Sequence, residues 1–461
     1  FTIELLRGMQ ERGDVVKDKD DQWIEAAALD WEKLPARVEA VIAERIKRLP
    51  QPMREILRIA SVEGEEFSAE VVAQVLERDE REVVRQLSSE LDRKHNLIRA
   101  QAIERLGAQR LSRYRFRHYL CQKYLYETLD PVERSYLHED VGIVLEKLYD
   151  QQVQAIAPQL AHHFQEAGIT NKAIHYLHQA GEKAVALSAY HEAVTHLKQG
   201  LALLMTLPES QERDELELTL LLSLGKAVKG RPAKEWRKTL TRALEVCQKT
   251  GNTVELCQIF GELATVHYVR GELSMARRRA EEALSAAQQT SDPSVVALAH
   301  WFLGFVLFSM GEYTSAREHL MEMIAFYDPQ QHHEFYVLNR GSDPGVSAMA
   351  YEALCLWCLG YPDQASQRSQ EALVLARELD HPFSEVDVIC YAGCVFDAMR
   401  RYAVELKNNA DRLRQISLYY SFPGWSETAL CYQGSALFML GQVEESVARI
   451  REGLEGNRST G

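Results

Sequence analysis

The stretch GFVLFSMGEYTSA, residues 304–316, contains the spacing that decides the fold of this chain. Its central glycine, Gly311, is followed five residues later by the small Ala316 and preceded seven residues earlier by the small Gly304. Glycine adopts the left-handed conformation that ends a helix at little cost. Small residues let two helix axes approach closely. The stretch therefore predicts a helix, a tight turn and a second helix packed against the first.

The same spacing occurs five times along the chain. The five sets, each written as small residue, glycine and small residue, are Ala161/Gly168/Ala173, Ala264/Gly271/Ala276, Gly304/Gly311/Ala316, Ala353/Gly360/Ala365 and Gly434/Gly441/Ser446. The last four glycines are separated by 40, 49 and 81 residues, which indicates a period near 40. The widest gap holds a degenerate unit, with Arg401 where the glycine is expected and Ala410 and Leu413 in its second helix.

This pattern is typical of a loose tetratricopeptide-like (TPR-like) repeat, in which stacked neighbours supply the core and form an extended concave surface. We therefore expect residues 155–461 to form TPR-like helical repeats. A helix at about 171–187 is expected to be shared between two units, and residues 214–248 to form a further pair. The prolines and glycines of Tyr327–Val346 predict a non-helical loop, which we expect to carry ligand contacts.

The part before the repeats predicts a small winged-helix domain at residues 34–125. Apolar residues at helical spacing predict its helices, one of them starting at Phe67-Ser68. Two short strands, Leu97–Ala100 and Tyr114–His118, are expected to follow and to form the wing. Residues 126–154 are predicted to be connecting helices. The fold class is therefore mainly all-α: a TPR-like α-solenoid superhelix preceded by a small winged-helix domain.

Basic residues are concentrated around the predicted wing. Between positions 93 and 123, nine of them accompany one carboxylate, Glu104: Arg93, Lys94, Arg99, Arg105, Arg110, Arg113, Arg115, Arg117 and Lys123. Such a surface binds DNA, packs on an acidic domain or meets nucleotide phosphates. The preceding helix carries carboxylates that would repel a DNA backbone: Glu80, Glu82, Glu90 and Asp92. We therefore do not expect DNA to be the partner.

The bulk composition limits the remaining function classes. The net charge of −14 argues against a protein that coats nucleic acid and agrees with a cytoplasmic location. The sequence has no apolar run of about 18 residues, so no membrane association is expected. Cys355 and Cys358 lie in an apolar helical stretch and are interpreted as core residues. The pairs His162-His163 and His332-His333 lack a third ligand at a recognisable spacing, so no metal site is predicted.

Several segments resemble a known family. The segments FTIELL (1–6), LPARVEAVIAERIKRLP (34–50) and YRFRHYL (114–120) resemble the region that follows the nucleotide-binding core in bacterial signal-transduction ATPases with numerous domains. The segments GSDPGV (341–346), LGYPDQA (359–365) and ELDHPFS (378–384) are similar to the repeats of a large group of these proteins. Members of that group often carry a class III adenylate or guanylate cyclase domain.

The resemblance implies an organisation and one candidate site residue. Residues 1–33 would be the end of a truncated ATPase module and a linker. His118 matches the winged-helix histidine that reaches the phosphates of bound ADP in the family; a histidine packed between strand and helix is the alternative. The chain has no G-x-x-x-x-G-K-[ST] motif, because Leu224-Gly225-Lys226 lacks the upstream glycine and the following hydroxyl. ATP or ADP and Mg²⁺ are therefore expected in a separate ATPase domain.

These observations predict the regulatory region of a signalling ATPase, with no catalytic, cofactor-binding or metal-binding residues of its own. The repeats would bind a protein or small-molecule effector, and the winged helix would relay this to the ATPase and output domains. Three alternatives remain open from the sequence. The chain is part of a nucleotide cyclase polypeptide, a DNA-binding transcription regulator, or a repeat scaffold that acts as a spacer.

Overall fold

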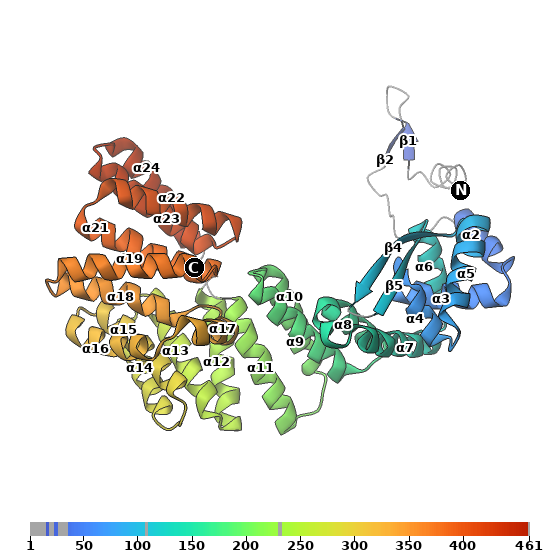
Figure 1. The fold of residues 1–461 in the computed structure, drawn as a ribbon, viewed down its shortest axis with the longest axis horizontal. Helices are drawn as coiled ribbons and strands as arrows, with labels where there is room; N and C mark the ends of the chain where they lie inside the picture. Colours follow the sequence, from blue (N-terminus) through green and yellow to red (C-terminus); the bar gives the residue numbers. More distant parts are fainter. Residues whose placement is uncertain (1–14, 18–22, 26–35, 107–108, 229–232, 460–461) are drawn as a thin grey trace. The chain divides into compact units, whose positions relative to one another are not determined.

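The computed structural model describes residues 15–17, 23–25, 36–106, 109–228 and 233–459 (Figure 1). By its internal contacts the chain divides into two compact units, unit 1 at Phe1–Tyr176 and unit 2 at Leu177–Gly461. The division falls inside helix α9 (Thr170–Ala186). Apart from residues 15–17 and 23–25, the segment predicted as the end of an ATPase module and a linker, residues 1–33, lies outside the described residues.

Unit 1 combines short helices with two antiparallel sheets. Its elements are β1 (Val15–Lys17), β2 (Trp23–Glu25), α2 (Ala36–Lys47), α3 (Gln51–Glu63), β3 (Glu66–Ser68), α4 (Ala69–Val75), α5 (Glu80–Arg85), the π-helical segment η1 (Gln86–Lys94), β4 (Ile98–Leu106), β5 (Gln109–Phe116), α6 (Tyr119–Glu127), α7 (Pro131–Tyr149), the 3-10 segment η2 (Asp150–Ile156) and α8 (Ala157–Glu166). The order of helices followed by an antiparallel β-hairpin is the one that the sequence predicts.

The larger sheet of unit 1 corrects one prediction. Its strand order is β3-β5-β4, so Phe67-Ser68 does not start a helix but belongs to a third strand. Phe67 pairs with Tyr114 of β5, and its buried ring packs 5.3 Å from the ring of Phe116. Glu63 accepts hydrogen bonds from the backbone N–H and the hydroxyl of Ser68, which fixes the strand end. A strand of three residues is too short to show alternation in the sequence.

The β-hairpin differs from its prediction in length. β4 and β5 are longer than the predicted strands, and β5 ends at Phe116. His118 therefore lies outside the strand, as the residue that precedes the first turn of α6, with extended φ and ψ angles of −137° and 123°. β4 is exposed over most of its length, so it has no buried face whose apolar residues could mark its full extent in the sequence.

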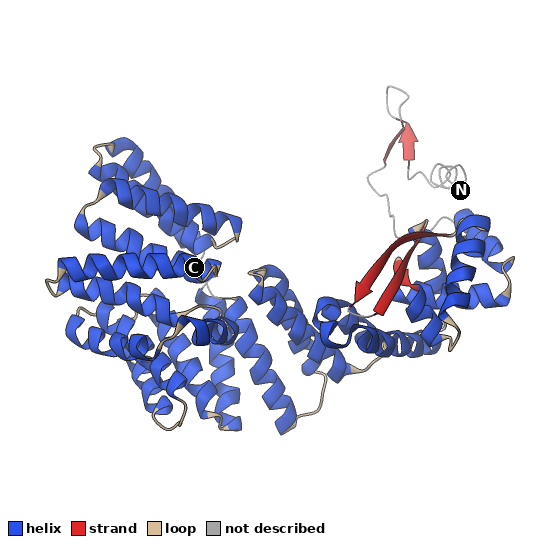
Figure 2. Cartoon of the chain, viewed as in Figure 1, coloured by secondary structure: helices blue, strands red, loops and turns tan. Residues whose placement is uncertain are grey.

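Unit 2 is helical throughout its described residues (Figure 2). After the second part of α9 its elements are α10 (Tyr190–Leu204), α11 (Gln211–Ala227), α12 (Ala233–Thr250), α13 (Thr253–Val269), α14 (Leu273–Ala287), α15 (Pro293–Ser309), α16 (Tyr313–Phe326), α17 (Pro329–Arg340), α18 (Pro344–Cys358), α19 (Pro362–Glu378), α20 (Pro382–Val388), η3 (Ile389–Val395), α21 (Phe396–Arg400), α22 (Ala403–Tyr419), α23 (Pro423–Met439) and α24 (Val443–Ser459). Segments α20, η3 and α21 are contiguous. Unit 2 is thus an α-solenoid of helical hairpins.

The turns confirm the repeat pattern. All five predicted glycines adopt positive φ angles: Gly168 76°, Gly271 72°, Gly311 84°, Gly360 87° and Gly441 82°. Arg401 takes the same left-handed conformation, with φ 62°, in the unit predicted to be degenerate. Ser188 does so with φ 58° between α9 and α10, so the helix at the position of the predicted shared helix ends in the same kind of turn.

The small residues lie where two helices of one hairpin touch. A Cβ atom on Gly304 of α15 would lie 2.8 Å from Leu320 Cγ of α16. A Cβ on Gly434 of α23 would lie 2.5 Å from Ile450 Cγ1 of α24. Both separations are shorter than atoms tolerate, so a larger residue would push the helices apart. The sequence spacing therefore marks real close contacts.

The segment predicted as a loop, Tyr327–Val346, is largely helical, and that prediction is wrong. It contains α17 and the first turn of α18. Each helix begins with an aspartate whose carboxylate accepts hydrogen bonds from the backbone, followed by proline: Asp328-Pro329 and Asp343-Pro344. Proline is favoured in the first turn of a helix, where its missing N–H is not needed. The prolines here start helices instead of excluding them.

Candidate functional site

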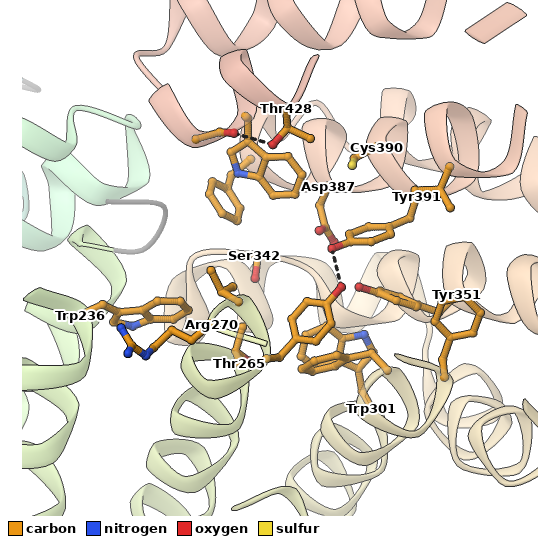
Figure 3. A pocket seen from close by; sticks show the side chains of 18 of the residues that line it. Trp236, Thr265, Arg270, Trp301, Ser342, Tyr351, Asp387, Cys390, Tyr391 and Thr428 are labelled. Carbon is orange, nitrogen blue, oxygen red and sulfur yellow. Dashed lines mark hydrogen bonds between the residues drawn. The ribbon is translucent and has the colours of Figure 1, made fainter. Parts of the chain in front are cut away.

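A cavity in unit 2 has a volume of about 810 Å³, and aromatic side chains form nearly half of its lining (Figure 3). Its walls come from the helices of successive hairpins, α12, α13, α15, α18, α20–η3, α23 and α24, and from the inserted helix α17. Ten of its 21 lining residues are aromatic, and three carry charge: Arg270, Arg340 and Asp387. We call this cavity the inner pocket.

Helical periodicity brings the aromatic residues together. On α15, Trp301, Phe305 and Phe308 recur at spacings of four and three residues, so they share one face. Trp301 packs against Phe305 with ring centroids 4.8 Å apart. The ring of Tyr351 lies 5.9 Å from that of Phe305 and 4.5 Å from that of Tyr391. The four side chains give the pocket flat apolar surfaces, with hydroxyl groups at the tyrosine end.

Arg340, at the end of α17, is the most enclosed charge of the pocket. Its side chain is 3% exposed, and its Nε lies 3.0 Å from Glu262 Oε1 of α13. The guanidinium carbon lies 4.2 Å from the centre of the Trp301 ring and 5.1 Å from that of Phe302, and the group donates a hydrogen bond to Ser342. Burial is tolerated because an ion pair and two cation–π contacts replace water.

A polar network holds α17 and α18 in place behind Arg340. Asp343 is fully buried, and its carboxylate accepts a hydrogen bond from Tyr327 at 2.5 Å and contacts His333 Nδ1 at 2.7 Å. Its backbone N–H donates to Ser384 on α20. Burial and the charge of Asp343 raise the pKa of Tyr327 far above its usual value of 10, so this hydroxyl stays a donor. The inserted segment is thereby joined to two neighbouring repeats.

Tyr351, Tyr391 and the thiol of Cys390 in the pocket are neutral at physiological pH. Burial raises the pKa of both Tyr351 and Tyr391 well above 10, with neighbouring tyrosines adding to it. Burial likewise raises the pKa of the Cys390 thiol, and the charge of Asp387 adds to this. A thiol held protonated is a poor nucleophile. The inner pocket is therefore better suited to binding than to nucleophilic chemistry.

The other cysteines support the prediction of a core role. Cys355, Cys390 and Cys394 are buried, and Cys358 is partly buried. Burial raises the pKa of Cys355 to about 12. Within the part of the chain that the structure describes, no group of three or more histidine, cysteine, aspartate or glutamate side chains is arranged to hold a metal ion.

The two histidine pairs have different surroundings. His163 is buried, and its Nδ1 lies 2.9 Å from Nδ1 of His138 on α7. Burial lowers the pKa of His163 to about 3 and that of His138 to about 4. His332 accepts a hydrogen bond from the backbone N–H of Asp328 at the start of α17. These contacts serve the packing and the start of helices.

His118, the predicted nucleotide-sensing residue, is an exposed residue at the start of α6. Partial burial lowers the pKa of its imidazole, and the positive charges of Arg45 and Arg117 lower it further. Arg117 is itself anchored by an ion pair with Asp92 at 2.7 Å. The surroundings of His118 are therefore basic, and its role as a phosphate sensor stays a prediction.

Some of the basic residues in and around the β-hairpin form ion pairs with carboxylates of unit 1. Arg113 lies 3.0 Å from Glu104 and 3.5 Å from the buried Glu63, and Arg115 lies 2.7 Å from Glu65. Lys94 lies 2.9 Å from Glu90. Burial raises the pKa of Glu63 to about 7, against the opposing effects of Ser68 and Arg113. Much of the basic charge seen in the sequence is thus used inside unit 1.

Comparisons with known proteins do not show a family for this chain. No protein family model matches it. An uncharacterized protein of Rhizobium meliloti (strain 1021) is 21% identical over 401 residues, which are 84% of this chain, and the chain spans 38% of the length of that relative. Among the described helices, none combines the length and the hydropathy that a membrane crossing requires.

Two solved structures illustrate the likeness in fold. A Rap protein complexed with competence and sporulation factor shares 15% identity at a TM-score of 0.49, covering 74% of this chain and 91% of its own. A signal transduction ATPase with numerous domains and a tetratricopeptide repeat sensor, from Pyrococcus horikoshii, shares 12% identity at a TM-score of 0.39, covering 93% and 66%. Likenesses of this size do not say what the chain binds.

The inner pocket was not predicted from the sequence. Its residues come from positions as distant as Trp236 and Asn457, and each looks locally like an ordinary residue of an amphipathic helix. One signal was present: Tyr327–Val346 was expected to carry ligand contacts, and this segment supplies Arg340 and Ser342 to the pocket.

Proposed function

We propose that this chain is the regulatory region of a signalling ATPase and that unit 2 binds an effector in the inner pocket. The observation that carries the proposal is the pocket itself: about 810 Å³, aromatic walls and a few enclosed charges. Pockets of roughly 300–1,000 Å³ with apolar walls and a few placed polar groups are typical of small-molecule sites. The effector is then a small molecule, or a side chain or terminus of a peptide.

The position of the pocket suggests how binding acts. Its walls include Trp236 on α12 and Trp425 on α23, which belong to distant hairpins. A ligand that contacts both favours one curvature of the solenoid over another, provided its affinity for the two states differs. Such a change of curvature is the output that we propose unit 2 passes to the rest of the polypeptide.

Unit 1 is proposed to be a winged helix that relays nucleotide state. The basic surroundings of His118, Arg45 and Arg117 agree with a contact to phosphate groups. ATP or ADP and Mg²⁺ would belong to an ATPase domain of a longer polypeptide, and a nucleotide cyclase domain is the output that the family resemblance suggests. The pairing of the hairpin arginines with carboxylates makes DNA a less suitable partner.

The test compares a pocket-filling variant with a matched control. Thr428 of α23 lines the pocket, and its hydroxyl bonds the carbonyl oxygen of Gly424. Thr428→Trp fills the cavity, whereas Thr428→Val keeps its volume. The protein is purified from its host cells and denatured, and released molecules are identified by mass spectrometry. Candidates are then tested by the rise in Tm that they cause.

A molecule enriched with wild type and Thr428→Val, but absent from Thr428→Trp, supports the proposal. Its addition should also change the rate of ATP hydrolysis by the longer polypeptide, and this effect should be lost in Thr428→Trp. If no molecule is enriched and none raises Tm, or if Thr428→Trp retains the molecule equally, the proposal is wrong. A Tm of the unliganded variants close to wild type shows that they are folded.

A further inference from the structure

Three buried nitrogen donors line the inner pocket without a hydrogen-bond acceptor among the described residues. They are the indole nitrogens of Trp236 and Trp301 and Nε of Arg340. Their residues are 4%, 6% and 3% exposed. Arg340 Nε lies at ion-pair distance from Glu262, but the angle is not that of a hydrogen bond. Among the buried side-chain atoms of the pocket that lack a partner, all are donors.

Because the groups without partners are all hydrogen-bond donors, a ligand has to supply acceptors. A buried donor without an acceptor destabilises the protein, so a ligand that brings oxygen acceptors recovers part of that lost stability. Charged donors such as a guanidinium form their strongest hydrogen bonds with carboxylates. Trp301 and Arg340 are in contact, ring against guanidinium, so one oxygen-bearing group reaches both after small side-chain rotations.

The rest of the pocket limits the shape of the ligand. Figure 3 shows Trp236 and Arg270 on one side of the cavity and Asp387, Cys390 and Tyr391 on the other. The acidic Asp387, which accepts a hydrogen bond from Ser347, is thus on the side away from Trp236. An anionic group is disfavoured next to Asp387. At Arg340 the guanidinium attracts it, and the carboxylate of Glu262 opposes part of that attraction. The aromatic rings between these two ends suit a flat apolar body.

We propose that the inner pocket binds a ligand in which a carboxylate is attached to a flat apolar body, with the carboxylate at Arg340 and Trp301. This inference rests on the proposed function, because it takes the pocket as the effector site. A carboxylate on a flat apolar body occurs both in a free aromatic acid and in the C-terminal residue of a peptide. The experiment distinguishes these two sources.

The experiment uses three probes with the same ring system. 2-Naphthylacetate is anionic, 2-naphthylacetamide is neutral, and 2-(2-naphthyl)ethylamine is cationic. Their affinity for the full chain is measured by calorimetry, with the rise in Tm as a second readout. The acetate is expected to bind about tenfold more tightly than the amide, and the amine more weakly still. A pentapeptide of four alanines and a terminal phenylalanine, with a free or an amidated C-terminus, tests the peptide source.

The variants test which donor is responsible. Trp301→Phe keeps an aromatic ring but removes the indole N–H, so the preference for acetate over amide should fall about fivefold. Trp425→Phe is the matched control, because Trp425 lines the same pocket and its indole nitrogen is not among the buried donors without a partner. It should leave the preference within about twofold of wild type. The acetate-to-amide ratio is informative because a general loss of folding lowers both affinities together.

Two contrary results have different meanings. If the amide or the amine binds as tightly as the acetate, or if Trp301→Phe and Trp425→Phe behave alike, the carboxylate inference is wrong while an effector pocket stands. If no probe binds and no molecule is enriched with wild type over Thr428→Trp, the proposed function fails and this inference fails with it. Preference for the free peptide C-terminus over naphthylacetate would assign the carboxylate to a peptide.

Discussion

The helical hairpin α15–α16 and the inserted helix α17 are built on opposite principles within one solenoid. In the hairpin, close apolar contact does the work: Gly304 admits Leu320, and the turn at Gly311 requires no side chain. Buried polar groups hold the inserted segment in place. Asp343 accepts hydrogen bonds at the start of α18, and Arg340 pairs with Glu262. The first kind of element builds a frame, and the second places charge inside it.

The difference has an energetic consequence. Apolar contacts are numerous and individually weak, so a hairpin loses stability gradually when one contact changes. A buried ion pair is costly to form and costly to break on one side. The segment that supplies the pocket with its most enclosed cation should therefore be the part of unit 2 most sensitive to a single substitution.

The largest effect is expected from Arg340→Met. The substitution keeps an apolar stem but removes the cation from the buried carboxylate of Glu262, which should lower the free energy of unfolding of unit 2 by about 3 kcal/mol. Urea unfolding is followed by tryptophan fluorescence, which reports mainly on unit 2 because Trp236, Trp301 and Trp357 lie there, as does Trp425.

The double variant Glu262→Gln/Arg340→Met is the control for this prediction. It removes both charges, so it should recover most of the lost stability, leaving a deficit of about 1 kcal/mol. A loss under 1 kcal/mol in the single variant, or a double variant no more stable than the single one, would show that the ion pair does not anchor the insertion.

The sequence predicts the hairpins better than it predicts the inserted helix and the pocket. The turn at Gly311 and the contact at Gly304 are decided by residues close in sequence, so a local pattern finds them. The start of α17 was misread because Asp328-Pro329 is a sign of a turn and of a helix N-terminus alike. The inner pocket was invisible because Trp301 and Tyr391 meet only through the stacking of repeats.

A smaller effect is expected where the frame itself is overpacked. Gly304→Ala places a methyl group 2.8 Å from Leu320 Cγ and 3.3 Å from the carbonyl oxygen of Ala316, so α15 and α16 must separate. The expected loss in the free energy of unfolding is about 2 kcal/mol. Gly225→Ala in α11 is the matched control, because its new Cβ would meet Leu240 at an ordinary 3.5 Å.

The control should move in the opposite direction. Alanine is the better helix former by about 0.8–1 kcal/mol, so Gly225→Ala should stabilise unit 2 slightly. Equal stability changes in the two variants, measured by the same urea unfolding, would mean that the small residues of the hairpin are not required for close packing.

The smallest effect on stability is expected from a polar contact within the hairpin α15–α16. His300 of α15 and His319 of α16 face each other with their Nδ1 atoms 2.8 Å apart. Burial lowers the pKa of both from the usual 6.5; for His300 the charge of His319 lowers it further, while Glu322 opposes the shift in both and Glu318 in His319. Below pH 6.5 the unfolded chain therefore binds more protons than the folded hairpin.

Stability should then fall as the pH falls through 6.5 and should be constant above about pH 7.5. The slope is at most about 1.4 kcal/mol per pH unit for each histidine. The difference in the free energy of unfolding between wild type and His300→Gln/His319→Gln, measured at pH 7.5, 6.5 and 5.5, isolates this pair from other histidines. Wild type should lose more stability than the variant between pH 6.5 and 5.5. Parallel losses would show that the pair does not stay neutral in the folded hairpin, and the apolar frame would then accept charge as readily as the insertion does.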